Sequence, residues 1–215
     1  MLTKSIISER NNGPFLDFYD VVLRLSKYRI NSKELSALID SGSLDILCPS
    51  RATMRKNLAN ALNFASVSSD NMGGFIKLEK PIMIQAQDDL LFNFNKEIDV
   101  LKSSFSISPL SICNSRYNIK FTNLLNIKNT NNTIFVPCLL RSMKTITTKN
   151  GSSMAFINVF DDSTEQEFAL FSEPYKLSIN ALKKNTIIII KGRYRSLKND
   201  FYIEKIFELG DKLDG

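Results

Sequence analysis

Residues 145–162 read TITTKNGSSMAFINVFDD, which predicts two strands joined by a basic, glycine-containing turn and closed by an acidic turn. Strand side chains alternate between the two faces of a sheet, so Phe156, Asn158 and Phe160 are expected on one face. Aromatic rings beside a lysine-bearing loop suit single-stranded nucleic acid, whose bases stack on rings and whose phosphates pair with cations. The alternative is that Phe156 and Phe160 belong to the hydrophobic core.

The C-terminal part of the chain, which contains this stretch, predicts five short strands and one helix. The strands are expected at 134–143, 154–161, 167–171, 186–195 and 201–207, and the helix at 174–183. Five strands with a helix between the third and the fourth match the OB-fold, a partly open barrel that commonly binds oligonucleotides. The fourth strand ends with basic residues on one face, and a further lysine and a tyrosine follow. The residues are Lys191, Arg193, Arg195, Lys198 and Tyr202.

The N-terminal part is expected to be helical. After Pro14, apolar residues recur at intervals of three and four, which predicts an amphipathic helix with this proline in its first turn. Asn31 or Ser32 is expected to cap a second helix that ends before Gly42, and Ser50 is expected to cap a third. The predicted fold class is therefore α+β, with an all-α N-terminal module and a C-terminal barrel.

Two helices joined by a tight glycine turn form a helix-hairpin-helix pattern. Backbone amides at such a turn can bind a phosphate, helped by the helix dipole. An ordinary helical hairpin is the alternative. The candidate duplex-binding residues are Ser41, Gly42, Ser43, Arg51, Arg55 and Lys56.

The middle of the chain is more polar than its two ends. We therefore expect three domains: the helical module at 1–65, a linker region at 66–132, and the OB-fold domain at 133–215. Polar runs at 66–74 and 126–133 read as linkers. Between them, QAQDDLLFNF at 85–94 is a short peptide with acidic residues and an apolar tip. Such a peptide can dock in a partner's pocket while it remains extended. The alternative is a helical turn that packs Leu91 and Phe92 on the protein's own core.

Composition narrows the classes of function. The net charge is +6 with a pI near 9.2, which suits a polyanionic partner. The chain has no histidine, which excludes the common serine and cysteine triads. The cysteines Cys48, Cys113 and Cys138 lack metal-ligand spacing, so we expect reduced thiols, no metal and no cofactor. We expect no membrane span and no signal peptide. Asp161 and Asp162 read as an acidic turn, with a nuclease site as the alternative.

Two regions resemble the C-terminal portion of the bacterial DNA polymerase III alpha subunit. GPFLDFYD at 13–20 and NSKELSALIDSGSLD at 31–45 are similar to that family's helix-hairpin-helix region. TKNG at 148–151 and MAF at 154–156, with the two aspartates and then Phe171 and Tyr175, are similar to its OB domain. The two modules also occur in the same order.

The resemblance implies a function for the middle peptide, because these polymerases carry a sliding-clamp-binding motif between the two modules. The implied clamp-binding residues are Gln87, Asp88, Asp89, Leu90, Leu91 and Phe92. The chain departs from the family where Ile107-Ser108-Pro109-Leu110 replaces a Gly-His-Pro-Leu-like stretch. This departure leaves residues 97–125 without an assigned role.

The function expected from the resemblance is that of a non-catalytic, cytoplasmic fragment of a longer polymerase, because the family's polymerase and phosphoesterase domains are not in this chain. The hairpin is expected to hold duplex DNA, and the OB face single-stranded template. The expected partners are DNA, the sliding clamp and other replisome proteins, with no membrane. An adaptor module whose OB domain binds protein is the alternative. The candidate single-strand-binding residues are Arg141, Lys144, Lys149, Phe156, Arg193, Arg195, Lys198 and Tyr202.

Overall fold

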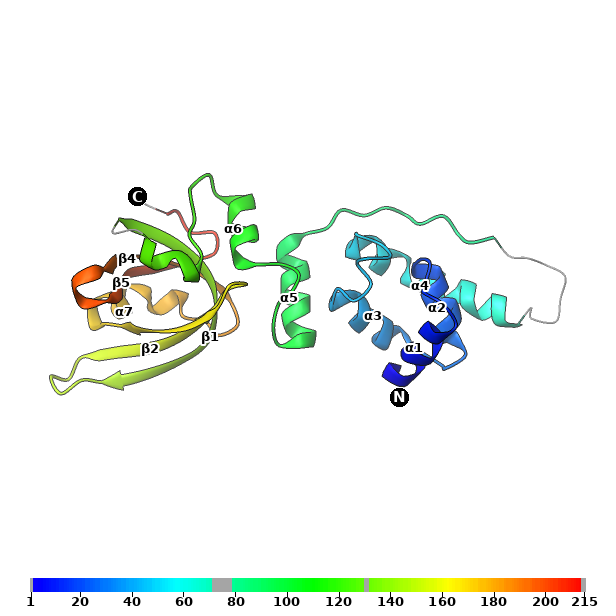
Figure 1. Ribbon diagram of the computed structural model, residues 1–215, viewed down its shortest axis with the longest axis horizontal. Coiled ribbons are helices and arrows are strands. Elements are labelled where there is room, and N and C mark those ends of the chain that lie inside the picture. Colours follow the sequence, from blue (N-terminus) through cyan, green and yellow to red (C-terminus); the bar gives the residue numbers. More distant parts are fainter. Residues whose placement is uncertain (1, 71–78, 130–131, 214–215) are drawn as a thin grey trace. The chain divides into compact units, whose positions relative to one another are not determined.

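The computed structural model describes residues 2–70, 79–129 and 132–213, and the chain divides into two compact units, 1–106 and 107–215. The regular secondary structure described in the N-terminal unit is helical (Figure 1). Its helices are α1 (Leu2–Asn11), α2 (Phe18–Ser26), α3 (Ser32–Asp40), α4 (Arg51–Asp70) and α5 (Leu90–Leu101).

The predicted caps of two helices are confirmed. The Asn31 side chain accepts a hydrogen bond from the Glu34 amide at 2.9 Å, and the Glu34 carboxylate accepts one from the Asn31 amide at 3.0 Å. This capping box starts α3. The Ser50 hydroxyl accepts a bond from the Thr53 amide at 3.1 Å at the start of α4. Gly42 lies just beyond α3 with φ of +75°.

The start of α2 differs from the prediction. The sequence predicts Pro14 in the first turn, whereas α2 begins at Phe18, because the Asp17 side chain caps the helix by accepting a bond from the Asp20 amide at 2.8 Å. Pro14 lies in the irregular segment before α2, where its carbonyl accepts a bond from the Arg24 guanidinium at 3.0 Å. The core of the unit is formed mainly by the apolar faces of α2, α3 and α4.

Glu9 ties α1 to α2. Its carboxylate accepts bonds from Lys27 at 2.5 Å and from the Tyr28 hydroxyl at 2.8 Å, and the Arg24 guanidinium lies at 3.4 Å. The hydrogen bond from Lys27, followed by that from Tyr28, lowers the pKa of Glu9 from 4.5 to about 2.

Glu9→Gln is therefore expected to change how the stability of the N-terminal unit depends on pH. A carboxyl whose pKa is lowered by folding stabilises the fold above its unfolded pKa, and this contribution is lost as the pH falls through its folded pKa. The variant should be less stable than wild type at pH 6, and the difference should shrink between about pH 4.5 and pH 2. Hydrogen exchange of α1 and α2 at pH 6 and during acid titration measures this difference. A constant difference would contradict the assignment.

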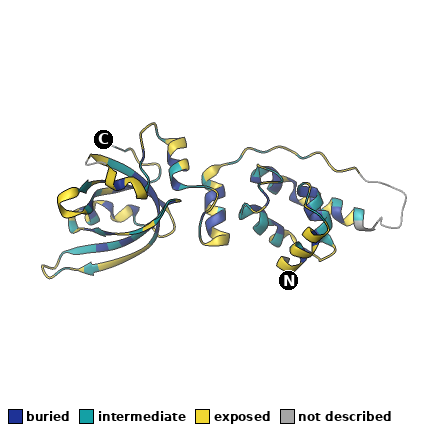
Figure 2. Ribbon diagram, in the orientation of Figure 1, coloured by how far each residue is buried: buried dark blue, intermediate teal, exposed yellow. Residues whose placement is uncertain are grey.

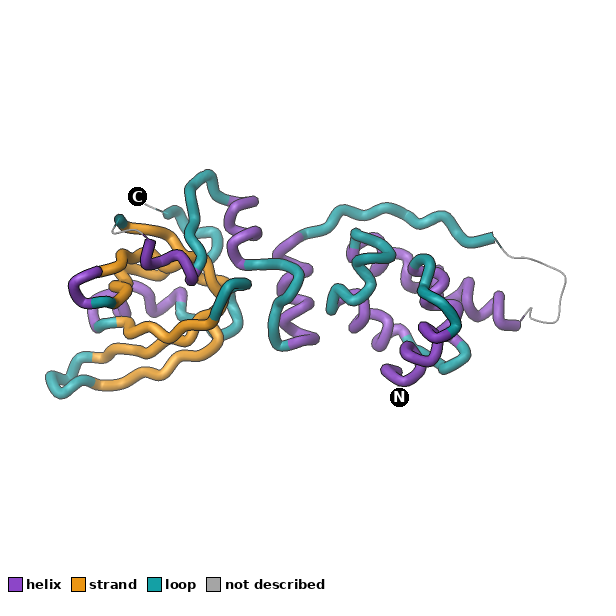
Figure 3. Tube along the Cα trace, in the orientation of Figure 1, coloured by secondary structure: helices purple, strands orange, loops and turns teal. Residues whose placement is uncertain are grey.

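The C-terminal unit contains an antiparallel sheet of order β3-β2-β1-β4-β5. Strand β1 pairs with β2 along one part of its length and with β4 along the other, with a bulge between Leu140 and Ser142. Helices α7 and η2 lie between β3 and β4, as the OB-fold requires. The elements are α6 (Pro109–Arg116), η1 (Leu124–Asn129), β1 (Thr133–Thr147), β2 (Ser153–Phe160), β3 (Glu165–Leu170), α7 (Ser172–Ser178), η2 (Ile179–Ala181), β4 (Ile187–Arg195), η3 (Ser196–Lys198) and β5 (Asp200–Glu208) (Figure 3).

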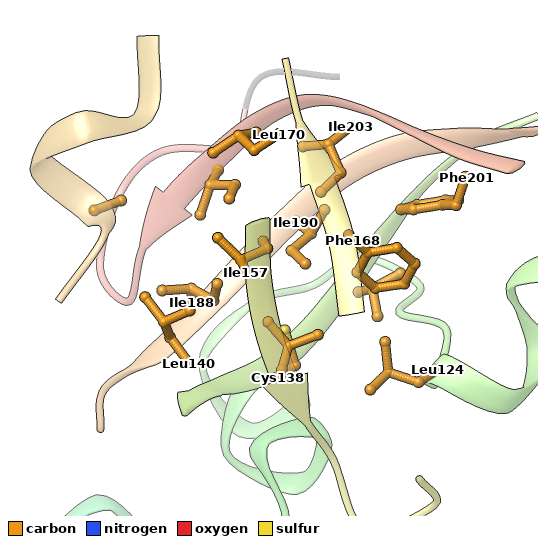
Figure 4. Packing of buried hydrophobic residues seen from close by; sticks show 14 of the residues in the cluster. Leu124, Cys138, Leu140, Ile157, Phe168, Leu170, Ile188, Ile190, Phe201 and Ile203 are labelled. Atoms are coloured by element: carbon orange, nitrogen blue, oxygen red, sulfur yellow. The ribbon is translucent and has the colours of Figure 1, made fainter. Parts of the chain in front are cut away.

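The predicted α+β class, with N-terminal helices and a five-stranded OB-like sheet, is confirmed. Strand β1 runs four residues beyond the predicted end at Met143, through Thr147. The alternation along β2 is also confirmed. Inward-facing Ile157 is fully buried and packs with Ile188 and Ile190 of β4 in the barrel core (Figure 4). Phe156 and Phe160, which alternate with the inward residues of β2, are only partly buried and lie outside this core.

The two polar runs expected as linkers contain regular structure where they are described. Helix α4 continues through Asp70, and the remaining residues of the first run, 71–74, lie outside the described part. The second run overlaps η1, where Leu124 and Ile127 are buried in the barrel core, while residues 130–131 lie outside the description. Figure 2 shows which described residues of these elements are buried, intermediate or exposed.

The residues that depart from the family pattern start a helix. The Ser108 hydroxyl accepts a bond from the Ser111 amide at 3.0 Å, and Pro109 occupies the first position of α6. This helix packs against β1 and buries Ile112 and Cys113. No described helix combines the length and apolarity needed to cross a membrane.

Candidate nucleic-acid interface and partner peptide

The hairpin turn after α3 is built around Gly42. The φ of +75° favours glycine here, and a Cβ would lie 2.0 Å from a guanidinium nitrogen of Arg51, so any other residue would also displace that guanidinium. The hydroxyls of Ser41 and Ser43 both donate to the Leu38 carbonyl at 3.0 Å. These three predicted phosphate-site residues thus form the turn itself.

Arg51 lies at the first position of α4 and is buried. Its guanidinium contacts Asp45 at 2.7 Å and Glu97 of α5 at 3.0 Å. Burial alone raises the pKa of Glu97, but bonds from the Ser106 hydroxyl, the Phe105 and Ser106 amides and Arg51 bring this pKa below its ordinary value. The charge of Arg51 is therefore engaged by carboxylates of its own unit.

Arg55 lies one turn further along α4 and also joins helices. Its guanidinium contacts Asp40 of α3 at 2.7 Å and the Asn93 side chain of α5 at 2.8 Å. It also lies 5.0 Å from the centre of the Phe92 ring. Lys56, by contrast, is exposed on α4. Among the basic residues predicted here, Lys56 thus presents its side chain to solvent.

Residues 84–88, which we call the strap, run extended alongside α4 within the N-terminal unit. The buried Asn57 side chain donates to the Ile84 carbonyl at 2.8 Å and accepts from the Ile84 amide at 2.9 Å. The Thr53 hydroxyl accepts from the Ala86 amide at 3.0 Å and donates to the Ala86 carbonyl at 3.2 Å. Two α4 side chains therefore pair with the strap as a neighbouring strand would.

The strap ends at the N-terminus of α4. The Asp88 carboxylate accepts bonds from the Ala52 amide at 2.9 Å and from the Asn93 side chain at 2.8 Å. Burial raises the pKa of Asp88, but these bonds lower it below its ordinary value overall. The carboxylate also lies where the helix dipole favours negative charge.

The predicted clamp peptide is only partly extended. The sequence predicts a peptide that docks while extended, whereas α5 begins at Leu90, because the Asp89 side chain caps it by accepting a bond from the Phe92 amide at 3.0 Å. Leu90 and Phe92 are 43% and 47% exposed, and Gln87 is exposed. Leu91 is half-buried. The apolar tip of the peptide thus remains accessible in the first turn of α5.

A row of outward-facing cationic and aromatic side chains begins on β1 and β2. Lys144 of β1 lies opposite Phe156 of β2, and the Arg141 guanidinium lies 4.5 Å from the centre of the Phe160 ring. On the other side of β2, Phe156 lies opposite Ala169 of β3. Cations of β1 therefore lie beside aromatic rings of β2 on this face.

A ring stack continues this row beyond β3. Phe171, two residues after Ala169, stacks with Tyr202 of β5 at 6.2 Å between ring centres and 24° between planes. The Arg195 guanidinium lies 4.6 Å from the Tyr202 ring centre and 2.8 Å from the Asp200 carboxylate. Phe171 was not among the predicted site residues, although its period-two spacing from Glu167 and Ala169 is a signal that could have found it.

The remaining predicted basic residues flank this surface or lie in loops. Arg193 is exposed beside Tyr202 in the register of β4 and β5, with Glu204 at 3.6 Å. Lys149 lies in the turn of the β1–β2 hairpin, which projects from the rest of the barrel (Figure 1). Lys198 ends η3, between β4 and β5.

The acidic turn after β2 has a structural role. Asp161 is fully buried and accepts bonds from the amides of Leu124, Ser163 and Thr164 at 2.7, 2.8 and 3.0 Å. It fixes the β2–β3 turn and holds η1 against the barrel. The nuclease alternative requires this carboxylate to be accessible, so the structure contradicts it.

Comparison with known proteins confirms the resemblance found in the sequence. Residues 2–54 match the family described as helix-hairpin-helix motif. DNA polymerase III subunit alpha of Bacillus subtilis is 30% identical over 202 residues, covering 88% of this chain and 18% of that protein. The protein of the same name from Staphylococcus epidermidis is 28% identical over 215 residues, covering 96% and 20%. That from Staphylococcus aureus is 25% identical over 199 residues, covering 89% and 18%. The chain thus spans about a fifth of the length of these relatives.

Proposed function

We propose that this chain, which resembles the C-terminal region of the DNA polymerase III alpha subunit over most of its length, is the DNA-binding and clamp-tethering region of a replicative polymerase. The helix-hairpin-helix match and the homologues support DNA as its partner.

The observation that carries the proposal is the row of rings and cations on the outer surface of the sheet. In our proposal, Phe156, Phe171 and Tyr202 stack with bases of single-stranded template. Each stacked base contributes roughly 1–3 kcal/mol in such sites. The cations of this surface and of its loops pair with phosphates, and these residues are Arg141, Lys144, Lys149, Arg193, Arg195 and Lys198.

For duplex DNA we propose the hairpin turn at 41–43 and the exposed Lys56. Such contacts reach the phosphates and fix position without reading sequence. In this proposal Arg51 and Arg55 act indirectly, because their bonds to carboxylates hold the hairpin in shape. We propose that other replisome proteins bind the remaining exposed surface.

We further propose that residues 87–92 bind the sliding clamp. The partial exposure of Leu90 and Phe92 supports this, since apolar side chains at the start of a helix would otherwise favour burial. Tethering to a clamp that encircles DNA raises the effective concentration of the polymerase at the primer end. The reduced state of Cys48, Cys113 and Cys138 is in keeping with a cytoplasmic location.

Phe92→Ala tests the tether. We expect clamp affinity to fall roughly 30-fold, on the order of 2 kcal/mol, because aromatic anchors in pockets dominate such interfaces. Surface plasmon resonance on immobilised sliding clamp measures this change. Phe105→Ala is the matched control, because Phe105 is 80% exposed in the same unit but lies outside the peptide. Equal affinity of the Phe92 variant and wild type would remove the peptide from the clamp interface.

One observation favours the adaptor alternative. Arg193 and Arg195 both lie near carboxylates, Glu204 and Asp200, which reduces the net positive charge at this end of the surface. An OB domain that binds a protein partner through its rings would show association that is insensitive to salt. Binding of DNA would then be weak at every salt concentration.

A further inference from the structure

We propose that Thr53 and Asn57 are positioning residues that hold the strap on α4 and thereby present the adjoining peptide to the sliding clamp. This inference rests on the proposed function of residues 87–92. It assigns a role to two buried polar side chains of α4, which are 1% and 0% exposed. Buried polar groups are usually hydrogen-bonded, and both of these side chains form hydrogen bonds with the strap backbone.

The pairing works because two structural repeats nearly coincide. Four residues of an α-helix rise about 6 Å, and two residues of an extended chain rise about 6.6–6.8 Å. Thr53 and Asn57 are four apart on α4, while their partners Ala86 and Ile84 are two apart on the strap. The chain directions are opposed, so the next strap residue of this alternate set, Asp88, arrives at the N-terminus of α4. A helix face thus acts as the neighbouring strand for this segment.

This pairing fixes the backbone immediately before the peptide. The backbones of Ile84 and Ala86 are occupied by α4, and Gln85 and Gln87 are exposed between and beyond them. Asp88 then fixes the chain at the helix end, and Asp89 caps α5 immediately afterwards. The clamp therefore meets Gln87, Leu90 and Phe92 on a segment that is already ordered.

Order before binding matters for affinity. A peptide that is free in solution loses backbone freedom when it docks, whereas a peptide held in place has already lost most of it. Without the α4 pairing, the residues before Gln87 would have to be ordered during association. We expect this loss to weaken clamp binding roughly tenfold.

The experiment compares Thr53→Val and Asn57→Ala with wild type in the 215-residue chain. Thr53→Val keeps the side-chain shape and removes only the hydroxyl, so the fold is retained even if Asn57→Ala loosens it. Asn60→Ala is the matched control, since Asn60 lies exposed on the same helix. Clamp affinity is measured by surface plasmon resonance, and hydrogen exchange reports the Ile84 and Ala86 amides directly.

The expected result is faster exchange of the Ala86 amide in Thr53→Val and of the Ile84 amide in Asn57→Ala, with roughly tenfold weaker clamp binding in both. Asn60→Ala should match wild type in both measurements. Clamp binding that is unchanged in Thr53→Val and Asn57→Ala, while Phe92→Ala weakens it, would overturn the positioning role and leave the tether intact. No clamp binding by wild type would overturn the tether, and the positioning role with it.

Discussion

Glu97→Ala is expected to lower the stability of the N-terminal unit by roughly 3–5 kcal/mol, because it leaves the buried Arg51 guanidinium without one of its partners. Arg51 and Glu97 side chains are 3% and 0% exposed, and they join α4 to α5 at 3.0 Å. The substitution also removes the acceptor of the Phe105 and Ser106 amides. Asp45, which remains, is partly exposed and compensates the charge only in part.

Hydrogen exchange of α4 amides measures this effect locally, which is necessary because a chain of two compact units need not unfold in one transition. Asp99→Ala is the control. It removes the same charge from an exposed position of the same helix and should change stability by less than about 0.5 kcal/mol. Because the pKa of Glu97 is lowered in the fold, its contribution should be present near neutral pH and decline in acid. Equal protection in the two variants would contradict a structural role for the pair.

The double variant Phe171→Ala/Tyr202→Ala is expected to weaken single-stranded DNA binding by the chain at least about 30-fold. The two rings stack on each other beside Arg195, so removing both eliminates a platform on which bases can continue the stack. Fluorescence anisotropy with labelled oligonucleotide measures the change.

Leu177→Ala is the control for this pair, because Leu177 is 65% exposed on α7 and is not one of the proposed ring residues. The far-ultraviolet circular dichroism of both variants should match wild type, since Phe171 and Tyr202 lie outside the barrel core. If the double variant binds as tightly as Leu177→Ala, the ring stack is not a DNA site.

Local sequence patterns predict most of the fold. Alternation along 154–160 gave both the strand and its outward face, because inward Ile157 and outward Phe156 differ in burial as period two requires. Cap chemistry located α3 and α4 through Asn31 and Ser50. The start of α2 was misplaced because Pro14 is a generic signal for a first turn, whereas the specific capping bond belongs to Asp17.

The parts of the site that the sequence could not give depend on contacts between distant residues. Arg51 reads as an exposed basic residue until Glu97, 46 positions later, is found beside it. Asn57 and Ile84 are likewise 27 positions apart, and no local period links a helix to a strap. The polar neighbourhood of the clamp peptide favours an extended form, but the capping bond of Asp89 places Leu90 in α5.

The most direct test of DNA binding is a titration of labelled single-stranded and primer-template DNA with the wild-type chain at several salt concentrations. The logarithm of the affinity is expected to fall linearly with the logarithm of the salt concentration, with a slope of about −0.7 for each single-strand phosphate contacted. Arg193→Ala should reduce the slope by about one such contact. Absence of binding even at low salt would contradict the account and leave the adaptor alternative in its place.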